Sequence, residues 1–225
     1  MKKYIKICVK RAWLLLRWLI LAGGMGILLG LVGGLFGKSV TWVTDFRNTH
    51  PWMLYLLPLA GLVIVGMDRL NPYKGGTNRV LESIQSHAYI PLRMAPLIVL
   101  STVLTHACGG SAGREGAALQ LGGSLGGTAG KWMKFDEYDH RLMIMCGMSA
   151  GFAALFGTPL TATVFAMEVI SVGMMQYAAL VPCSVAALTA KQTAELIGAY
   201  GEHFLIEQKV AFDLKNAVLV VLLAF

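Results

Sequence analysis

Long apolar runs separated by short polar segments dominate this chain. Residues 13–37 contain one charged side chain, residues 52–67 contain none, and residues 158–190 contain one. A helix needs about 20 mostly apolar residues to cross a bilayer, so the third run is long enough for two shorter segments. The pattern predicts an all-α, polytopic helical membrane protein.

The polar interruptions divide the chain into helices of unequal length. The expected helices cover residues 12–45, 52–69, 78–87, 91–107, 116–133, 141–156, 158–172 and 175–195. Several are too short to span, or are broken by glycine or proline, and this is typical of transporters whose binding site is built from helix ends. In the first helix, Gly26, Gly30 and Gly34 repeat every four residues, which predicts one face where another backbone approaches closely.

Composition strengthens the membrane interpretation and narrows the possible partners. Hydrophobic residues make up 56% of the 225 residues and charged residues only 14%, whereas about 25% is usual for soluble domains. The net charge is +7, and six basic residues crowd the first 17 positions without an acid: Lys2, Lys3, Lys6, Lys10, Arg11 and Arg17. This favours a cytoplasmic N-terminus in an inner (plasma) membrane over a secretory signal peptide. Aromatic residues do not alternate with these basic residues in the way typical of nucleic-acid binding, so no nucleic-acid partner is expected.

The cysteines and the single acid of the third run suggest structural roles. Cys8, Cys108, Cys146 and Cys183 are scattered without metal-ligand spacing, so we expect no metal, no cofactor and no disulfide framework. Glu168 is either a bundle-facing structural group or a functional one, and the structural interpretation is favoured.

Two glycine-rich segments stand where a helix is expected to begin, at residues 75–78 and 113–116. The first turn of a helix leaves N–H groups without partners, and the helix dipole makes that end positive. Glycine lets an anion approach these amides because no Cβ intervenes. The candidate anion-binding residues are Gly76, Thr77, Asn78, Gly113, Arg114, Gly116 and Ala117. An ionised Glu115 would compete with the anion for the same amides and leave when protonated.

Simpler interpretations of these residues stay open at this point. Glu115 could offset the helix dipole, which is worth about 0.3–1 kcal/mol. Arg114 could raise the local anion concentration or pair with an acid, and Thr77 could be an N-cap. The glycines between residues 122 and 130 suit helix packing. Residues 147–151 spell the G-x-S-x-G of serine hydrolases, but within an apolar helical run Ser149 suits packing better than nucleophilic attack.

The segment GREGAALQLGGSLGG, residues 113–127, resembles the G-[KR]-E-G-P motif of the CLC family of anion channels and anion/proton antiporters. GFAALFGTPLTATVFAMEV, residues 151–169, resembles a second family segment, and the likeness extends over about residues 12–225. It implies a CLC-type fold with short and re-entrant helices, and a halide anion and a proton as substrates. It further implies Glu115 as the gating, proton-exchanging glutamate and a homodimer in membrane lipid.

Three departures from the chloride members favour the fluoride/proton antiporter branch. The first anion loop reads Gly76-Thr77-Asn78 rather than G-S-G, and Ala117 stands where the motif has its final proline. Val169 occupies the place of the internal proton-transfer glutamate. The expected function is fluoride efflux coupled to proton exchange, without enzyme activity. The alternatives are a chloride channel or chloride/proton antiporter, a non-transporting truncated scaffold, and an intramembrane serine hydrolase at Ser149.

The family's halves are inverted repeats, and this sequence matches the first. We expect a basic N-terminus at residues 1–11, an N-terminal CLC-like half at 12–195, a polar linker at 196–212, and the truncated start of the second repeat at 213–225. The second anion loop and the pore tyrosine of the family belong to the other half.

Overall fold

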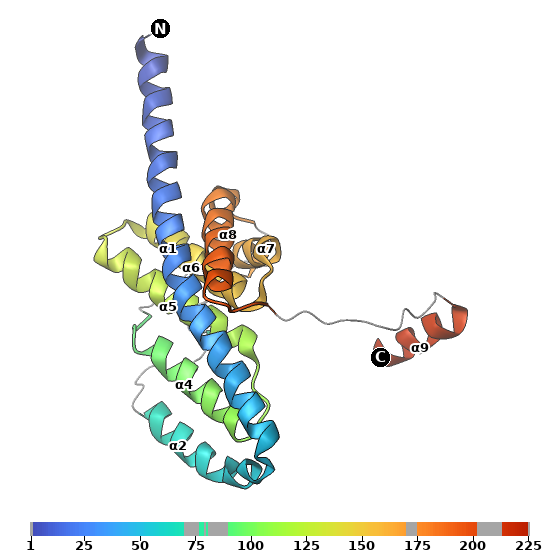
Figure 1. The fold of residues 1–225 in the computed structure, drawn as a ribbon. Helices are drawn as coiled ribbons and strands as arrows, with labels where there is room; N and C mark the ends of the chain where they lie inside the picture. Colours follow the sequence, from blue (N-terminus) through green and yellow to red (C-terminus); the bar gives the residue numbers. More distant parts are fainter. Residues whose placement is uncertain are drawn as a thin grey trace.

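The computed structural model describes residues 2–69, 77–78, 80, 90–169, 175–201 and 213–224. Every regular element in this part of the chain is helical (Figure 1). The α-helices are α1 (Lys2–Thr49), α2 (Leu57–Arg69), α4 (Met94–Ala107), α5 (Arg114–Trp132), α6 (Glu137–Phe156), α7 (Pro159–Glu168), α8 (Leu180–Leu196) and α9 (Leu214–Ala224). The 3₁₀ helices η1 (Pro51–Leu56) and η2 (Tyr177–Ala179) precede α2 and α8. The all-α expectation is confirmed, and most of the expected helix at 78–87 lies outside the described residues.

The first helix is longer than the expected span 12–45, because α1 runs unbroken from Lys2 to Thr49. Lysine, arginine and leucine are good helix formers, and no glycine, proline or capping residue interrupts the basic start. The helix ends where Pro51 disfavours a helical conformation at His50, which has φ −129° and ψ 72°. Its N-terminal part projects beyond the other helices (Figure 1).

Helix α6 lies at the centre and packs against α1, α5, α7 and α8. Its middle is fully buried on every side, at Met143, Ile144, Met145, Cys146 and Met148.

The two ends of α6 are fixed by single residues. The helix begins at Glu137, earlier than the expected residue 141, because the Asp136 side chain accepts a hydrogen bond from the Asp139 N–H at 2.8 Å. It ends at Phe156, because the next residue, Gly157, has a φ of +71°, a left-handed conformation that suits glycine.

Helices α5 and α6 meet through glycine. A Cβ at Gly126 would lie 2.6 Å from the Met143 carbonyl oxygen and 3.0 Å from the Ile144 Cα. A Cβ at Gly122 would press on the backbone of Gly147. Because these distances are shorter than a van der Waals contact, side chains larger than hydrogen cannot be accommodated here without moving a helix. This confirms the packing role expected of these glycines.

Helix α8 packs along the glycine face of α1. A Cβ at Gly26 would lie 2.6 Å from the Ala186 carbonyl oxygen, and one at Gly30 would lie 2.7 Å from that of Ala190. At Gly34 the neighbouring backbone is that of Ala194, with its Cα at 3.3 Å. The four-residue repeat of glycines in α1 therefore faces a four-residue repeat of alanines in α8, as its spacing predicts.

The apolar run at residues 158–190 forms two segments, as expected. The first, α7, begins with Pro159 at a position where its missing N–H costs nothing, and ends at Glu168, before the expected residue 172. The second is η2 followed by α8, which ends at Leu196. Figure 1 shows α9 standing apart from the other helices.

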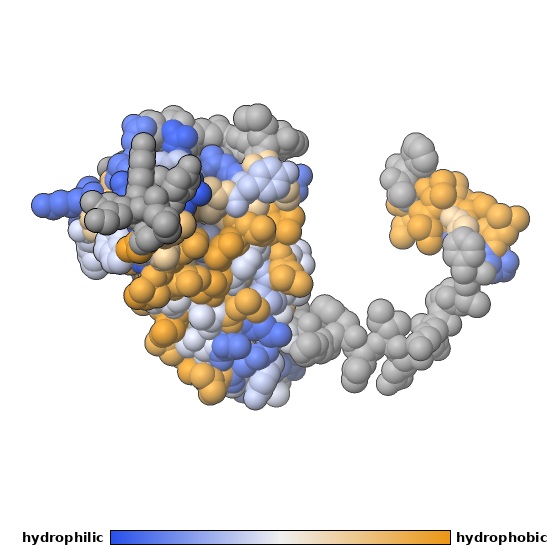
Figure 2. Space-filling model, turned by 90° about the horizontal axis from the view of Figure 1, so that it is seen from above, coloured by the Kyte–Doolittle hydropathy of each residue, from blue (hydrophilic) through white to orange (hydrophobic). Residues whose placement is uncertain are grey.

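Many large apolar side chains are exposed on the bundle, and Figure 2 shows apolar patches beside polar ones on the face that it draws. In the described part of the chain, two helical stretches are long and apolar enough to cross a membrane, Cys8–Thr49 and Pro51–Arg69. The second buries almost none of its side chains against the rest of the protein, Ala60 being the buried residue of α2. Large apolar side chains exposed on this scale suit contact with lipid.

Candidate functional site

The candidate site begins at the start of α5, two residues before the expected start at residue 116. Gly113 precedes the helix with φ −68° and ψ 125°, and no side chain caps the first turn. The N–H groups of the first turn therefore lack partners within the helix, and the helix dipole adds partial positive charge. A Cβ at Gly113 would meet no described atom within 4 Å.

The charged pair of the motif lies at this helix start, as the sequence predicts. Glu115 is exposed and Arg114 is half-buried, whereas Ala117 is 2% exposed. Glu115 makes no hydrogen bond or ion pair with any residue that the structure describes. Its carboxylate thus lies at the first turn of the helix without being held there by another described side chain.

The second glycine-rich segment comes to the same place. A Cβ at Gly116 would lie 3.0 Å from the Thr77 Oγ1, and the Gln120 Nε2 donates a hydrogen bond to that oxygen at 3.2 Å. Thr77 is half-buried and Asn78 is exposed, while Gly76 lies outside the described residues. Two segments far apart in the sequence therefore meet at the first turn of α5.

Sequence reasoning did not select Gln120. Its signal was nevertheless present, because an amide within the small and apolar run AALQLGG must find a hydrogen-bond partner when it is buried. The residue is 8% exposed, and its partner is the Thr77 hydroxyl. Only the fold shows which group that partner is.

A cavity of about 380 Å³ adjoins Arg114. Its walls include Lys38 and Asp45 of α1 and Tyr200 after α8. The Lys38 Nζ also donates a hydrogen bond to the Ile197 carbonyl oxygen at 3.0 Å, which connects α1 to the end of α8. With two cationic side chains and one acid in its walls, the cavity presents a net positive charge next to the start of α5.

A sequence profile described as voltage gated chloride channel matches residues 67–225. The chain belongs to the voltage-gated chloride channel family, the CLC family. It is 39% identical over 208 residues to a chloride/fluoride channel protein of Pseudomonas syringae, covering 91% of this chain and 46% of that protein. It is also 31% identical over 169 residues to the H⁺/Cl⁻ exchange transporter of Cronobacter sakazakii, covering 67% of this chain and 36% of that protein.

Solved CLC structures share the fold. A crystal structure of a CLC-type fluoride/proton antiporter superposes with a TM-score of 0.80 at 35% identity, over 92% of this chain and 53% of that one. A slow cyanobacterial Cl⁻/H⁺ antiporter superposes with a TM-score of 0.71 at 22% identity, over the same shares, and supports the fold alone. The chain thus spans about half the length of the relatives it matches.

CLC membership settles the class of the protein. CLC proteins are integral membrane transport proteins, which agrees with the expectation that the chain is not an enzyme. Ser149 lies in the middle of α6, fully buried, and donates a hydrogen bond to the Cys183 carbonyl oxygen at 3.2 Å. A hydrolase nucleophile of this motif needs a strand-to-helix turn, so the serine hydrolase alternative is wrong.

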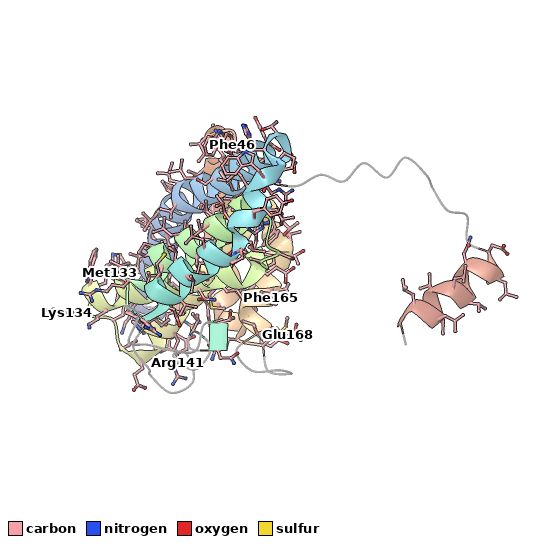
Figure 3. All side chains as sticks on the ribbon, turned by 90° about the horizontal axis from the view of Figure 1, so that it is seen from below. Phe46, Met133, Lys134, Arg141, Phe165 and Glu168 are labelled. Atoms are coloured by element: carbon pink, nitrogen blue, oxygen red, sulfur yellow. The ribbon has the colours of Figure 1, made fainter. Side chains whose placement is uncertain are left out.

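The expected position of Glu168 needs correction. This residue is exposed at the end of α7, at the edge of the bundle (Figure 3), and does not face the bundle interior. The helical period explains the difference, since α7 turns Ala162, Ala166 and Met167 inward and leaves Glu168 on the other face.

Three of the four cysteines are buried, which fits the structural role that the sequence suggests. Cys108, Cys146 and Cys183 are buried, and Cys8 is exposed on α1.

Proposed function

We propose that the chain carries the gating half of a CLC-type transporter that exports fluoride in exchange for protons. The observation that carries the proposal is the meeting of Glu115, Gly116 and Thr77 at the first turn of α5. Amides without helical partners and a hydroxyl offer hydrogen-bond donors for a small anion, and the carboxylate next to them is the competing ligand.

The proposed cycle follows from this competition. Ionised Glu115 occupies the anion path and blocks it. A proton neutralises the carboxyl group, which weakens its attraction to the amides, and the anion takes its place. When the proton leaves, the carboxylate returns and expels the anion, so one movement is tied to the other.

Fluoride is preferred over chloride as the substrate for two reasons. The relative from Pseudomonas syringae and the superposed antiporter both carry fluoride in their names. The chain also has Thr77-Asn78 in the anion loop, Ala117 in place of the proline of the motif and Val169 in place of a proton-transfer glutamate. Chloride transport is the second candidate, supported by the likeness to the H⁺/Cl⁻ exchange transporter.

The proposal includes the orientation of the protein in the membrane and its oligomeric state. The basic start of α1 favours a cytoplasmic N-terminus in the plasma membrane. The exposed apolar side chains of α2 and α7 suit lipid and a second subunit, and we propose a homodimer.

The test is transport by the full-length protein in liposomes. Fluoride and chloride efflux are read with ion-selective electrodes, and proton movement with a pH electrode. We expect fluoride efflux to exceed chloride efflux and to drive protons inward. Glu115→Gln should abolish proton movement, because its amide side chain does not take up a proton. Glu137→Gln, which changes an acid in the first turn of α6, is the matched control and should leave coupling unchanged.

Three other outcomes would each overturn part of the proposal. Proton coupling that survives in Glu115→Gln contradicts the gating role. Equal or chloride-favoured efflux keeps anion transport and overturns the fluoride assignment. Absence of any anion efflux leaves the non-transporting scaffold.

A further inference from the structure

The side chain of Gln120 extends from α5 one turn after Gly116 and reaches the Thr77 hydroxyl. The residue is 8% exposed, so its amide has little access to solvent. A buried amide without a hydrogen bond is costly, and the bond from its Nε2 to the Thr77 Oγ1 at 3.2 Å therefore constrains both side chains.

The direction of this bond determines what the hydroxyl can still do. A threonine hydroxyl has one proton to donate and two lone pairs that accept. Since the Thr77 oxygen accepts from Gln120, its proton is not used in this bond. Among the described residues, Thr77 donates no hydrogen bond.

The Thr77 hydroxyl lies beside a position of α5 that has no side chain. A Cβ at Gly116 would lie 3.0 Å from the Thr77 Oγ1, so the hydroxyl lies beside the first turn of the helix where a side chain would otherwise stand. An anion held by the amides of that turn would be within reach of the same hydroxyl.

We propose that Gln120 is a positioning residue that orients the Thr77 hydroxyl with its proton toward the anion. This inference rests on the proposed function. The Gln120 amide donates to the hydroxyl oxygen, so the hydroxyl proton turns away from Gln120 and toward the anion. Gln120 thereby acts on anion affinity without touching the anion.

The test is a double-mutant cycle in the full-length protein in liposomes, with fluoride as the probe. Gln120→Met keeps the length of the side chain and removes its donors. Because one neutral hydrogen bond is affected, we expect the KM for fluoride to rise by about two- to tenfold with little change in kcat. Thr77→Val should produce a similar rise. The KM of the double variant should be no higher than that of Thr77→Val alone, since Gln120 acts through the Thr77 hydroxyl.

Ser124→Ala is the matched control. Ser124 lies one turn further along α5, is fully buried, and donates to the Pro91 carbonyl oxygen at 2.9 Å, away from the site. Its variant should lower stability without raising the KM. If Gln120→Met does not fold, Gly116→Ala is the second variant. Its added Cβ would lie 3.0 Å from the Thr77 Oγ1, should displace that hydroxyl, and should also raise the KM for fluoride.

Failure of this inference differs from failure of the proposed function. A wild-type protein that moves no fluoride or chloride overturns both. A wild-type protein that transports fluoride, with an unchanged KM in Gln120→Met, overturns only the positioning role. Additive losses in the double variant also overturn it, because the two residues would then act independently.

Discussion

Glycine at three positions sets the distance between the two central helices. Gly122 and Gly126 of α5 face Gly147 and Met143 of α6 so closely that the backbones touch. Such contacts replace the burial of large side chains with many close van der Waals contacts between backbones. The start of α5, where the candidate site lies, takes its position from this contact.

Gly126→Ala should destabilise the protein by about 1–3 kcal/mol, because its Cβ would meet the Met143 carbonyl oxygen at 2.6 Å and force the helices apart. Gly23→Ala is the control, since a Cβ there meets no described atom within 4 Å. Thermal unfolding of the detergent-solubilised protein measures both. Equal Tm values for Gly126→Ala and the wild type would contradict this account of the contact.

Part of the candidate site could be predicted from the sequence pattern, and part could not. Glycines at two expected helix starts singled out Thr77 and, with an acid in the first turn, Glu115 as candidate residues, and the structure brings Thr77 to Gly116. The pattern could not select Gln120, because its role depends on a partner 43 positions away. Contacts between distant segments depend on how the helices pack, and a local sequence pattern does not contain that information.

At the scale of elements, the end of α6 controls where α7 begins. Gly157 adopts φ +71°, which reverses the chain so that Thr158 and Pro159 can start the next helix. Its N–H donates to the Ala153 carbonyl oxygen at 2.9 Å and closes the last turn of α6.

Gly157→Ala should lower stability by about 1–2 kcal/mol, because a side chain is strained in the left-handed region. Gly61→Ala in α2 is the control, since a Cβ there meets no described atom within 4 Å and alanine favours helix. Urea or thermal unfolding compares the two. A Gly157→Ala variant as stable as the wild type would show that this turn tolerates another conformation.

Element type was easier to predict than element bounds. The apolar runs identified most helices, but the first was placed at 12–45 where α1 covers Lys2–Thr49. Charged residues near a helix start do not end it, since lysine and arginine favour helix as much as many apolar residues do. The start of α6 was missed because a single side chain, Asp136, extends it by one turn.

For the whole molecule, the distribution of charge matters more than its sum. Lys38 and Arg114 lie at one cavity next to the candidate site, and Asp45 offsets one of the two charges. A positive field at the mouth of a pathway raises the local concentration of anions. Its effect falls with ionic strength, since the Debye length shrinks from about 10 Å at 0.1 M to about 3 Å at 1 M.

Arg114→Gln should therefore raise the KM for the anion at low ionic strength, and the difference from wild type should shrink when an impermeant salt is added. Lys131→Gln removes the same charge from the far end of α5, about 26 Å away along the helix, and serves as the control. Initial rates of efflux at several salt concentrations measure the effect. A loss that is independent of salt would assign Arg114 a structural role.

The contact between α5 and α6 has a consequence for motion. Two helices joined backbone to backbone, without intervening side chains, have no soft layer between them that would let one slide past the other. The first turn of α5 is then held in place, so in the proposed cycle the opening movement would fall to the side chain of Glu115, which is exposed and can change rotamer. Rotamer changes of exposed side chains take picoseconds to nanoseconds, so arrival of the proton, rather than the swing itself, would set the pace.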